Sequence, residues 1–231
     1  MKKKCCYISY GPHLIFFHDS YRIKDTFLNT FINIPYQSKL DNDIIICPPS
    51  ILNINFNKSI KREILVSFKG VSHRKSVHDN IDYRNLIMKT LKKFETEKII
   101  IEDSDSNKNS YVDLLYNSIF SVIIEGDVSW SYRITEVINS GSIPIVILPK
   151  HENILPFQQI LDYSKFSILL HYHEIDNFFT NILHKLDDNY IKFLQDNLYH
   201  VNQRVFLNRT TQINSLLNCI EYKFSNNTFI Q

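Results

Sequence analysis

Four polar residues between positions 129 and 136 are spaced so that together they could bind a nucleotide. Ser129, Ser131, Arg133 and Glu136 follow a glycine, Gly126, and open an amphipathic stretch. The first turn of a helix presents unpaired N–H groups and the positive end of the helix dipole, which favours a phosphate. The serine hydroxyls could cap the helix or donate, and Arg133 would add a cation. Glu136 could accept two hydroxyls of a ribose.

A second interpretation of the same spacing needs no ligand. Arg133 and Glu136 are three residues apart, so on a surface helix they could form an ion pair worth a few tenths of a kcal/mol. The sequence contains no GxxxxGK[ST] phosphate loop, and the segment is not a GxGxxG motif. Spacing alone therefore leaves the ion pair and the ligand site equally open.

The elements around this segment predict a βαβ unit. Residues 120–124 and 143–148 are apolar runs typical of buried strands, and Ile134, Val137 and Ile138 share one helix face between them. Gly141 follows the helix and suits a C-cap without any role in ligand binding. The unit would place the start of its helix just beyond the carboxyl end of the first strand.

The same alternation extends over residues 61–170. Further apolar strands are expected at 64–68, 98–101 and 166–170, with helices through Tyr83 to Phe94 and through Val112 to Ile119. Apolar strands that alternate with helices predict an α/β fold with a Rossmann-like, doubly wound parallel sheet. Ligands of such sheets bind beyond the carboxyl ends of the strands, where Gly70 and Gly126 fall. The alternative is that both glycines only form tight turns.

The flanking regions suggest two domains. Residues 1–60 contain short apolar runs at 5–9, 14–17 and 44–47, bounded by turn residues, and form a reduced N-terminal region with a connector. Residues 61–231 form the Rossmann-like domain, which ends in helices through 175–186, 194–205 and 213–220.

Composition restricts the classes of function. The 231 residues are 44% hydrophobic and 22% charged, as in ordinary globular proteins, and the net charge of +2 gives no basis for binding nucleic acid. The N-terminal stretch is broken by polar residues, so neither a signal peptide nor a membrane span is expected. The four cysteines form no CxxC pair. A reducing compartment, and hence a cytoplasmic location, is the expectation.

A family resemblance covers residues 41–190. The order of motifs resembles that of the exostosin-type (GT47-like) glycosyltransferases: DIIICPP at 43–49, KREILVSFKG at 61–70, YRNL at 83–86, YVDLLYNS at 111–118 and LPF at 155–157. Between these last two lies the family's central pattern. It is matched here by Phe120, Gly126, Ser131, Arg133, Glu136, Gly141, Ile143 and Pro144.

The resemblance implies a GT-B glycosyltransferase with two Rossmann-like lobes. The C-terminal lobe would bind a nucleoside-diphosphate sugar, UDP-linked by expectation, as substrate and without a further cofactor. Arg133 would bind the diphosphate and Glu136 the ribose, Gly126 and Ser131 would shape the phosphate turn, and Gly70 would line the loop between lobes. Arg84 is a further donor-side candidate that could instead brace the loops.

The same resemblance implies an acceptor, a glycan or another sugar acceptor, bound by the N-terminal lobe. About forty residues precede Asp41, whereas a full lobe would need on the order of a hundred. The alternative is therefore a non-catalytic nucleotide-sugar-binding subunit, with a partner chain that supplies the acceptor lobe. No base can be named from the family; His13, His18 and Asp19 are candidates by position only.

Two further patterns could hold a metal ion. Residues 41–43 and 103–105 both read as aspartate-x-aspartate, which metal-dependent GT-A enzymes use, and His171 alternates with His173. Acidic loops after strands are usually solvated turns, and a GT-B site needs no metal. The expectation is that no metal is bound.

Overall fold

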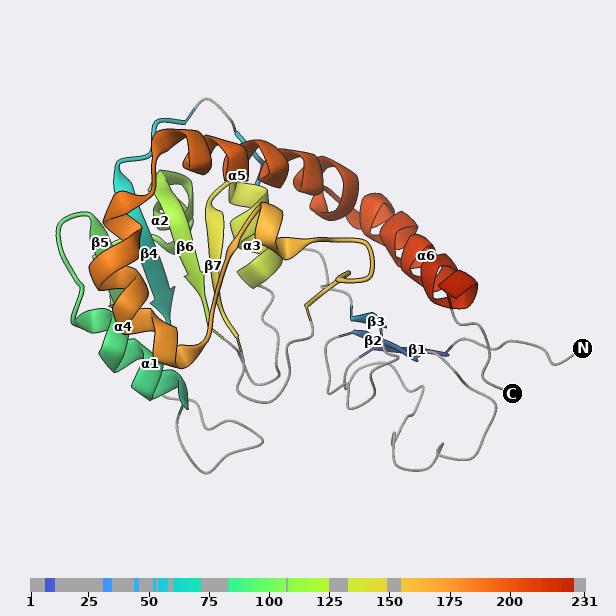
Figure 1. Cartoon of the computed structure of the whole chain (residues 1–231), viewed down its shortest axis with the longest axis horizontal. Coiled ribbons are helices and arrows are strands. Elements are labelled where there is room, and N and C mark those ends of the chain that lie inside the picture. Colours follow the sequence, from blue (N-terminus) through green and yellow to red (C-terminus); the bar gives the residue numbers. More distant parts are fainter. Residues whose placement is uncertain are drawn as a thin grey trace, which may run out of the picture.

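The fold is described by a computed structural model that covers residues 7–10, 31–34, 44–45, 52, 54–57, 60–71, 83–106, 108–124, 133–148 and 155–226. Two sheets are present within these residues (Figure 1). The smaller one pairs β1 (Tyr7–Tyr10), β2 (Phe31–Ile34) and β3 (Ile44–Ile45) in parallel. Of its strands, β1 and β3 overlap predicted apolar runs, whereas β2 was not predicted, and the run at 14–17 lies outside the described residues.

The larger sheet confirms the predicted α/β fold. It contains β4 (Ile64–Gly70), β5 (Ile99–Asp103), β6 (Ser118–Ile123), β7 (Ile143–Ile147) and β8 (Ile168–Leu170). The spatial order is β5-β4-β6-β7-β8, and every pair is parallel. The chain therefore winds outward in both directions from the neighbouring strands β4 and β6, as in a doubly wound sheet.

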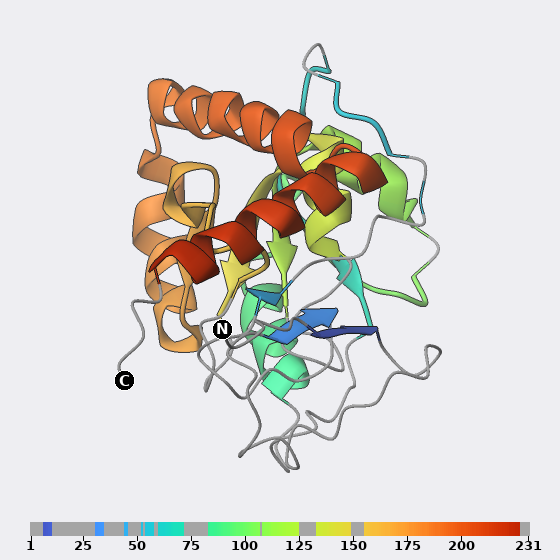
Figure 2. The same cartoon turned by 90° about the vertical axis from the view of Figure 1, so that its right-hand side faces the viewer.

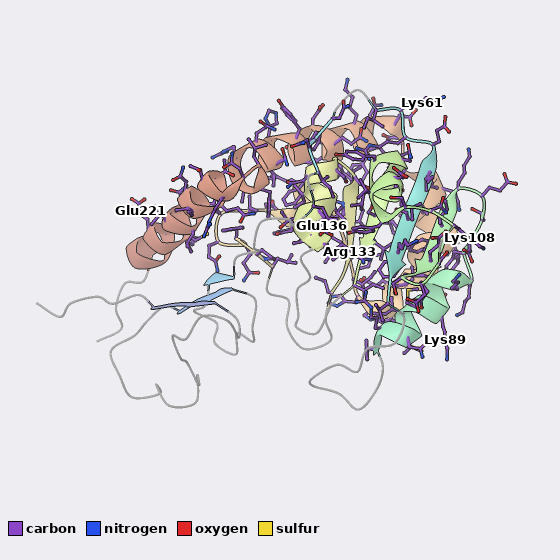
Figure 3. The ribbon with its side chains drawn as sticks, turned by 180° about the vertical axis from the view of Figure 1, so that it is seen from behind. Lys61, Lys89, Lys108, Arg133, Glu136 and Glu221 are labelled. Atoms are coloured by element: carbon purple, nitrogen blue, oxygen red, sulfur yellow. The ribbon has the colours of Figure 1, made fainter. Side chains whose placement is uncertain are left out.

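Helices cover both faces of this sheet (Figures 1 and 3). One layer contains α1 (Tyr83–Lys92) and the segment around α4 (Ile175–Asn177), and the other contains α2 (Tyr111–Asn117) and α3 (Arg133–Ser140). The strands β6 and β7 are buried almost throughout because helices lie on both sides of them. The core between the layers includes Phe68, Phe120, Ile134, Val137 and Ile145.

Some predicted element ends were wrong. Ile119 was placed on a helix, but α2 ends at Asn117 and β6 begins at Ser118, so Ile119 lies in the strand. The last strand begins at Ile168 rather than Phe166, because residues 163–165 form a 3-10 turn whose cap, Asp162, accepts from the backbone N–H of Ser164. Both errors arise where one apolar run continues across the boundary between two elements.

The C-terminal part is helical, as predicted. Residues 172–185 form a chain of short 3-10, α and π turns, followed by α5 (Asp188–Val201), a π-helical segment at 202–206 and α6 (Arg209–Asn226). The last helix runs from the larger sheet toward the smaller one and contacts β3 (Figures 1 and 2). The division into domains at residue 60 stays a prediction. Among the described helices, none is long and apolar enough to cross a membrane.

One half-buried arginine, Arg62, connects the ends of two helices. Arg62 donates through Nη1 to the carbonyl oxygens of Leu115, Tyr116 and Ser118, at 2.8–3.0 Å, and through Nη2 to that of Ser140 at 2.6 Å. These carbonyls lie at the C-terminal ends of α2 and α3, where helices lack intrahelical donors. Burial lowers the pKa of Arg62 to about 10, so the side chain stays charged at neutral pH.

Gly141 confirms its predicted role as a helix C-cap. Its φ of +77° is a left-handed conformation that favours glycine. Its N–H donates to the carbonyl of Ile138 at 3.1 Å. A Cβ atom on Gly141 would lie 2.9 Å from Nη2 of Arg62 and 3.0–3.1 Å from the Phe56 ring, so both side chains would have to shift.

Candidate nucleotide-binding site

The strand order identifies the carboxyl ends of two strands as the expected place for a ligand, the crevice referred to below. The connections leave β4 and β6 in opposite directions, so the carboxyl ends of these two neighbours form the topological switch point of the sheet. Gly70 is the last residue of β4, and α3 begins after β6 with Arg133 as its first described residue. Two of the predicted site residues therefore flank this crevice.

The guanidinium groups of Arg84 and Arg133 converge on Gly70. A Cβ atom placed on Gly70 would lie 2.7 Å from Nη2 and 3.1 Å from Nη1 of Arg133, and 3.1 Å from Nη2 of Arg84. The missing side chain of the glycine is thus what admits both cations. Two guanidinium groups brought this close together create a strongly positive spot that favours an anion with several oxygens, such as a diphosphate.

Phe68 lies beneath both arginines. Its ring centroid is 4.7 Å from Cζ of Arg133 and 5.6 Å from Cζ of Arg84, distances typical of cation–π contacts. Because side chains alternate along a strand, Phe68 and Gly70 face the same side of β4. Arg84 is buried, and its Nε donates to the carbonyl of Val71 at 2.5 Å. The aromatic ring and this hydrogen bond restrict where the two guanidinium groups can lie.

Tyr111 links Arg133 to Glu136. The Tyr111 hydroxyl donates to Oε2 of Glu136 at 2.7 Å, and Cζ of Arg133 lies 5.1 Å from the centroid of the Tyr111 ring. Burial raises the pKa of Tyr111 well above its ordinary value of 10, so its hydroxyl stays a donor at physiological pH. Figure 3 shows Arg133 and Glu136 projecting from the same end of α3.

The burial of Glu136 argues against a surface ion pair, one of the two interpretations that spacing left open. Its side chain is only 8% exposed and accepts a hydrogen bond from Tyr111, so a solvent-exposed ion pair does not describe it. The structure thus brings Gly70, Arg84, Arg133 and Glu136 to one end of the sheet. The predicted residues Gly126 and Ser131, with Ser129, lie outside the described residues.

A buried ion pair holds the loop that precedes Tyr111. Nζ of Lys69 lies 3.2 Å from Oε2 of Glu102 and donates to the carbonyls of Ser106 and Asn109 at 2.5 and 2.6 Å. Asn109 in turn donates its side-chain amide to Oε1 of Glu102 at 2.6 Å. The side chains of Lys69 and Glu102 are 10% and 5% exposed. This network holds Ser106 and Asn109 against β4 and β5, close to the start of α2.

Acid is expected to weaken this network. Burial opposes ionisation of Glu102, but the hydrogen bonds from Asn109 and Lys69 hold its pKa below the ordinary 4.5. A carboxyl whose pKa is lower in the folded state stabilises the fold fully above pH 4.5, and loses that contribution as the pH falls through the lowered value. Glu102→Gln should therefore cost about 1–2 kcal/mol at pH 7 and progressively less below pH 4.

Thermal unfolding of both proteins across this pH range tests the expectation. The exposed Glu95, which pairs with Lys92 at the end of α1, supplies the matched control Glu95→Gln. That substitution should leave the melting temperature almost unchanged at every pH. A difference between wild type and Glu102→Gln that stays constant down to pH 3 would argue against the ionised pair.

Among the other predicted candidates, Asp103 pairs in register with Gly70, on the side of β4 away from β6, and several others cannot be placed. Asp103 and Asp105 both accept from the Ser104 hydroxyl in a turn after the edge strand β5. His171 and His173 stack with a ring-centroid distance of 5.7 Å. Within the described part of the chain, no three His, Cys, Asp or Glu side chains form a group that could hold a metal ion. Residues 41–43, His13, His18 and Asp19 lie outside it.

Three contributing residues were not identified from the sequence. Phe68 and Lys69 were interpreted only as parts of a strand, and Tyr111 only as part of a motif. The signal for Phe68 is its position two residues before a glycine at a strand end, which puts both on one face. The signal for Lys69 is a charged residue inside an otherwise apolar strand, because a buried charge requires a partner.

Comparisons with known proteins address the family of the chain. The family model of the Exostosin GT47 domain matches residues 16–186. An exostosin-1 homolog of Caenorhabditis elegans is 28% identical over 125 residues, which are 48% of this chain and 32% of the relative. A probable glycosyltransferase of Arabidopsis thaliana is 24% identical over 149 residues, 64% of this chain and 29% of the relative. The chain spans about a third of the length of these curated relatives.

Among solved structures, the GtfA/B complex is similar at a TM-score of 0.48 and 12% identity, over 85% of this chain and 46% of that one. The family match carries more weight, because it covers well over half of the chain and includes β4 to β8, together with Gly70, Arg84, Arg133 and Glu136. The chain therefore belongs to the exostosin GT47 family of glycosyltransferase domains.

Proposed function

We propose that this chain binds a nucleoside-diphosphate sugar, with UDP as the nucleotide, and transfers the sugar to a glycan or another acceptor. The observation that supports the proposal most directly is the convergence of Arg84 and Arg133 on Gly70 at the switch point of the sheet. A diphosphate placed there would meet two guanidinium groups. Glu136 lies one helical turn along α3 from Arg133 and would accept the ribose hydroxyls.

In the proposed reaction the diphosphate is the leaving group. Negative charge grows on its bridging oxygen as the bond to the sugar breaks, and fixed cations at that point stabilise the transition state. Arg133 is held by Phe68 and Tyr111, and Arg84 by Phe68 and the Val71 carbonyl, so little reorganisation is needed. The two arginines would therefore do what a metal ion does in GT-A enzymes. Gly126 and Ser131 are proposed to complete the phosphate turn.

A second candidate function uses the donor site without catalysis by this chain alone. The chain aligns with about a third of each curated relative, and in this alternative acceptor binding and the general base come from outside the aligned region, for example from a partner chain. The protein would then be a nucleotide-sugar-binding subunit that does not turn over alone. Both functions use the same donor site, and they differ only in the chemistry of the isolated chain.

A donor panel tests the proposal and separates the two functions. The purified chain is titrated with UDP and with several UDP-sugars by calorimetry, and release of UDP is then measured by chromatography with and without added glycans. Release supports the enzyme, and binding without release supports the subunit. Failure to bind any of these ligands would contradict both. EDTA is expected to leave binding unchanged; abolished binding would support a metal-dependent site.

Gly70→Ala is expected to reduce UDP affinity without unfolding the protein. The new methyl group would push the ends of Arg84 and Arg133 away from their contacts with Phe68, a shift of side-chain ends that leaves the backbone in place. Loss of positioned charged hydrogen bonds costs about 1.5 kcal/mol or more, which is roughly tenfold in affinity. The measurement is UDP titration combined with thermal unfolding.

Gly141→Ala is the matched control, and it is expected to lose stability but to keep its affinity for UDP. The φ of +77° and the close Phe56 ring make a side chain there strained, at about 1–3 kcal/mol. The folded fraction should nevertheless bind UDP as wild type does. Equal UDP affinity of Gly70→Ala and wild type would separate Gly70 from the donor site.

A further inference from the structure

Tyr111 is the residue that joins two parts of the proposed site, Arg133 and Glu136. It is the first residue of α2, whereas Arg133 and Glu136 come from the first turn of α3, so the contact joins separate elements. Its ring lies against Arg133, with Cζ 5.1 Å from the ring centroid. Its hydroxyl donates to Oε2 of Glu136 at 2.7 Å and also interacts with the guanidinium of Arg133. One side chain therefore touches both the cation and the carboxylate.

The two contacts have different consequences. The ring, together with Phe68 at 4.7 Å, gives the guanidinium of Arg133 two aromatic contacts that restrict its position. The hydroxyl fixes the rotamer of Glu136 by occupying one acceptor position on one oxygen. An ionised carboxylate can accept about four hydrogen bonds, so capacity remains for a pair of vicinal hydroxyls.

The backbone of Tyr111 is itself anchored. Lys69, which stands between Phe68 and Gly70 on β4, donates to the carbonyls of Ser106 and Asn109 just before α2. Glu102 accepts from the Asn109 side chain and completes this support. On β4, Phe68 therefore supports the two arginines, Lys69 anchors the loop before Tyr111, and Gly70 leaves the space in which the guanidinium groups lie.

We infer that Tyr111 is a positioning residue of the donor site: its ring orients Arg133 toward the diphosphate, and its hydroxyl orients Glu136 toward the ribose. The identity of the ligand rests on the proposed function. That the ring and the hydroxyl of Tyr111 have different roles is a separate claim. It predicts that removing the hydroxyl and removing the ring have different effects on the two parts of the nucleotide.

The test compares UDP with inorganic pyrophosphate, which lacks the ribose. Tyr111→Phe keeps the ring but loses the hydroxyl, so it should weaken UDP binding about two- to tenfold and weaken pyrophosphate binding less. Tyr111→Leu removes the aromatic face and should weaken both ligands. Tyr222→Phe, at an exposed tyrosine on α6, is the matched control and should change neither. An unchanged ratio of UDP to pyrophosphate affinity in Tyr111→Phe would overturn the inference.

A ligand-free measurement keeps this result distinct from failure of the proposed function. The Nε–H signal of Arg133 in a nitrogen-15 correlation spectrum, assigned by its loss in Arg133→Ala, reports how firmly the guanidinium is held. The signal should persist in Tyr111→Phe and broaden or vanish in Tyr111→Leu. If the wild type binds neither ligand, the nucleotide proposal fails, while this signal still decides whether Tyr111 orients Arg133. An unchanged signal in Tyr111→Leu would contradict that role.

Discussion

Arg133→Ala is expected to weaken UDP binding by roughly 10- to 150-fold, which corresponds to the loss of about 1.5–3 kcal/mol in charged hydrogen bonds. The effect should be large because the guanidinium lies at the switch point of the sheet and is held between Phe68 and Tyr111 before any ligand arrives. A group that is already ordered loses little entropy on binding, so its removal costs most of its interaction energy.

Calorimetric titration of UDP measures this effect, and three further variants serve as comparisons for Arg133→Ala. Arg133→Lys keeps the charge but loses the planar fork, so its affinity should fall between wild type and Arg133→Ala. Arg209→Ala removes an exposed arginine from α6 and should bind UDP as wild type does. Asp103→Ala, at the end of β5, should also leave binding unchanged. Equal affinity of wild type and Arg133→Ala would refute the assignment of the site.

Arg62→Ala is expected to produce the largest loss of stability, about 3–4 kcal/mol, or roughly 10 °C in melting temperature for a chain of this size. Removal of the guanidinium takes the donor from the carbonyls of Leu115, Tyr116, Ser118 and Ser140 at once. Carbonyl groups that are buried without a donor carry the full cost of desolvation. The space beside Gly141 would also be left unfilled.

Thermal and urea unfolding measure this loss. The adjacent Lys61 supplies the control, because its side chain is 88% exposed and faces Glu63 at 3.7 Å in a solvated pair. Lys61→Ala should change stability by no more than about 0.5 kcal/mol. Arg62→Lys should be intermediate, since one ammonium cannot reach both helix ends as the guanidinium does. A melting temperature of Arg62→Ala within 2–4 °C of wild type, about 1 kcal/mol, would argue against this account.

Much of the larger sheet could be predicted from the sequence, because its signals are local. Buried parallel strands are apolar runs, and the helices between them show 3.6-residue periodicity, so β4, β6, β7 and α3 were all expected close to their observed positions. The place of Gly70 at a strand end followed from the same pattern. Local signals do not fix strand order, so the meeting of β4 and β6 at the switch point came only with the structure.

The contacts that shape the site could not be predicted, because they join residues far apart in sequence. Tyr111 and Glu136 are separated by 25 positions, and Arg62 lies 78 positions from Ser140. A tyrosine opening a helix and a lysine in a strand are each compatible with many partners. The sequence restricts the type of interaction they need, and the three-dimensional fold selects which partner satisfies it. The surface ion pair remained open at the sequence level for the same reason.

The direct junction between α2 and β6 has a consequence for how this domain can change in length. The helix ends at Asn117 and the strand starts at Ser118, so no linking residue can absorb an insertion. One added residue would rotate α2 by about 100° or shift β6 by one position, which would turn its inward side chains outward. Natural insertions and deletions should therefore avoid this junction. Engineered loops or tags inserted here should abolish folding, which makes residues 117–118 a poor place to divide or extend the chain.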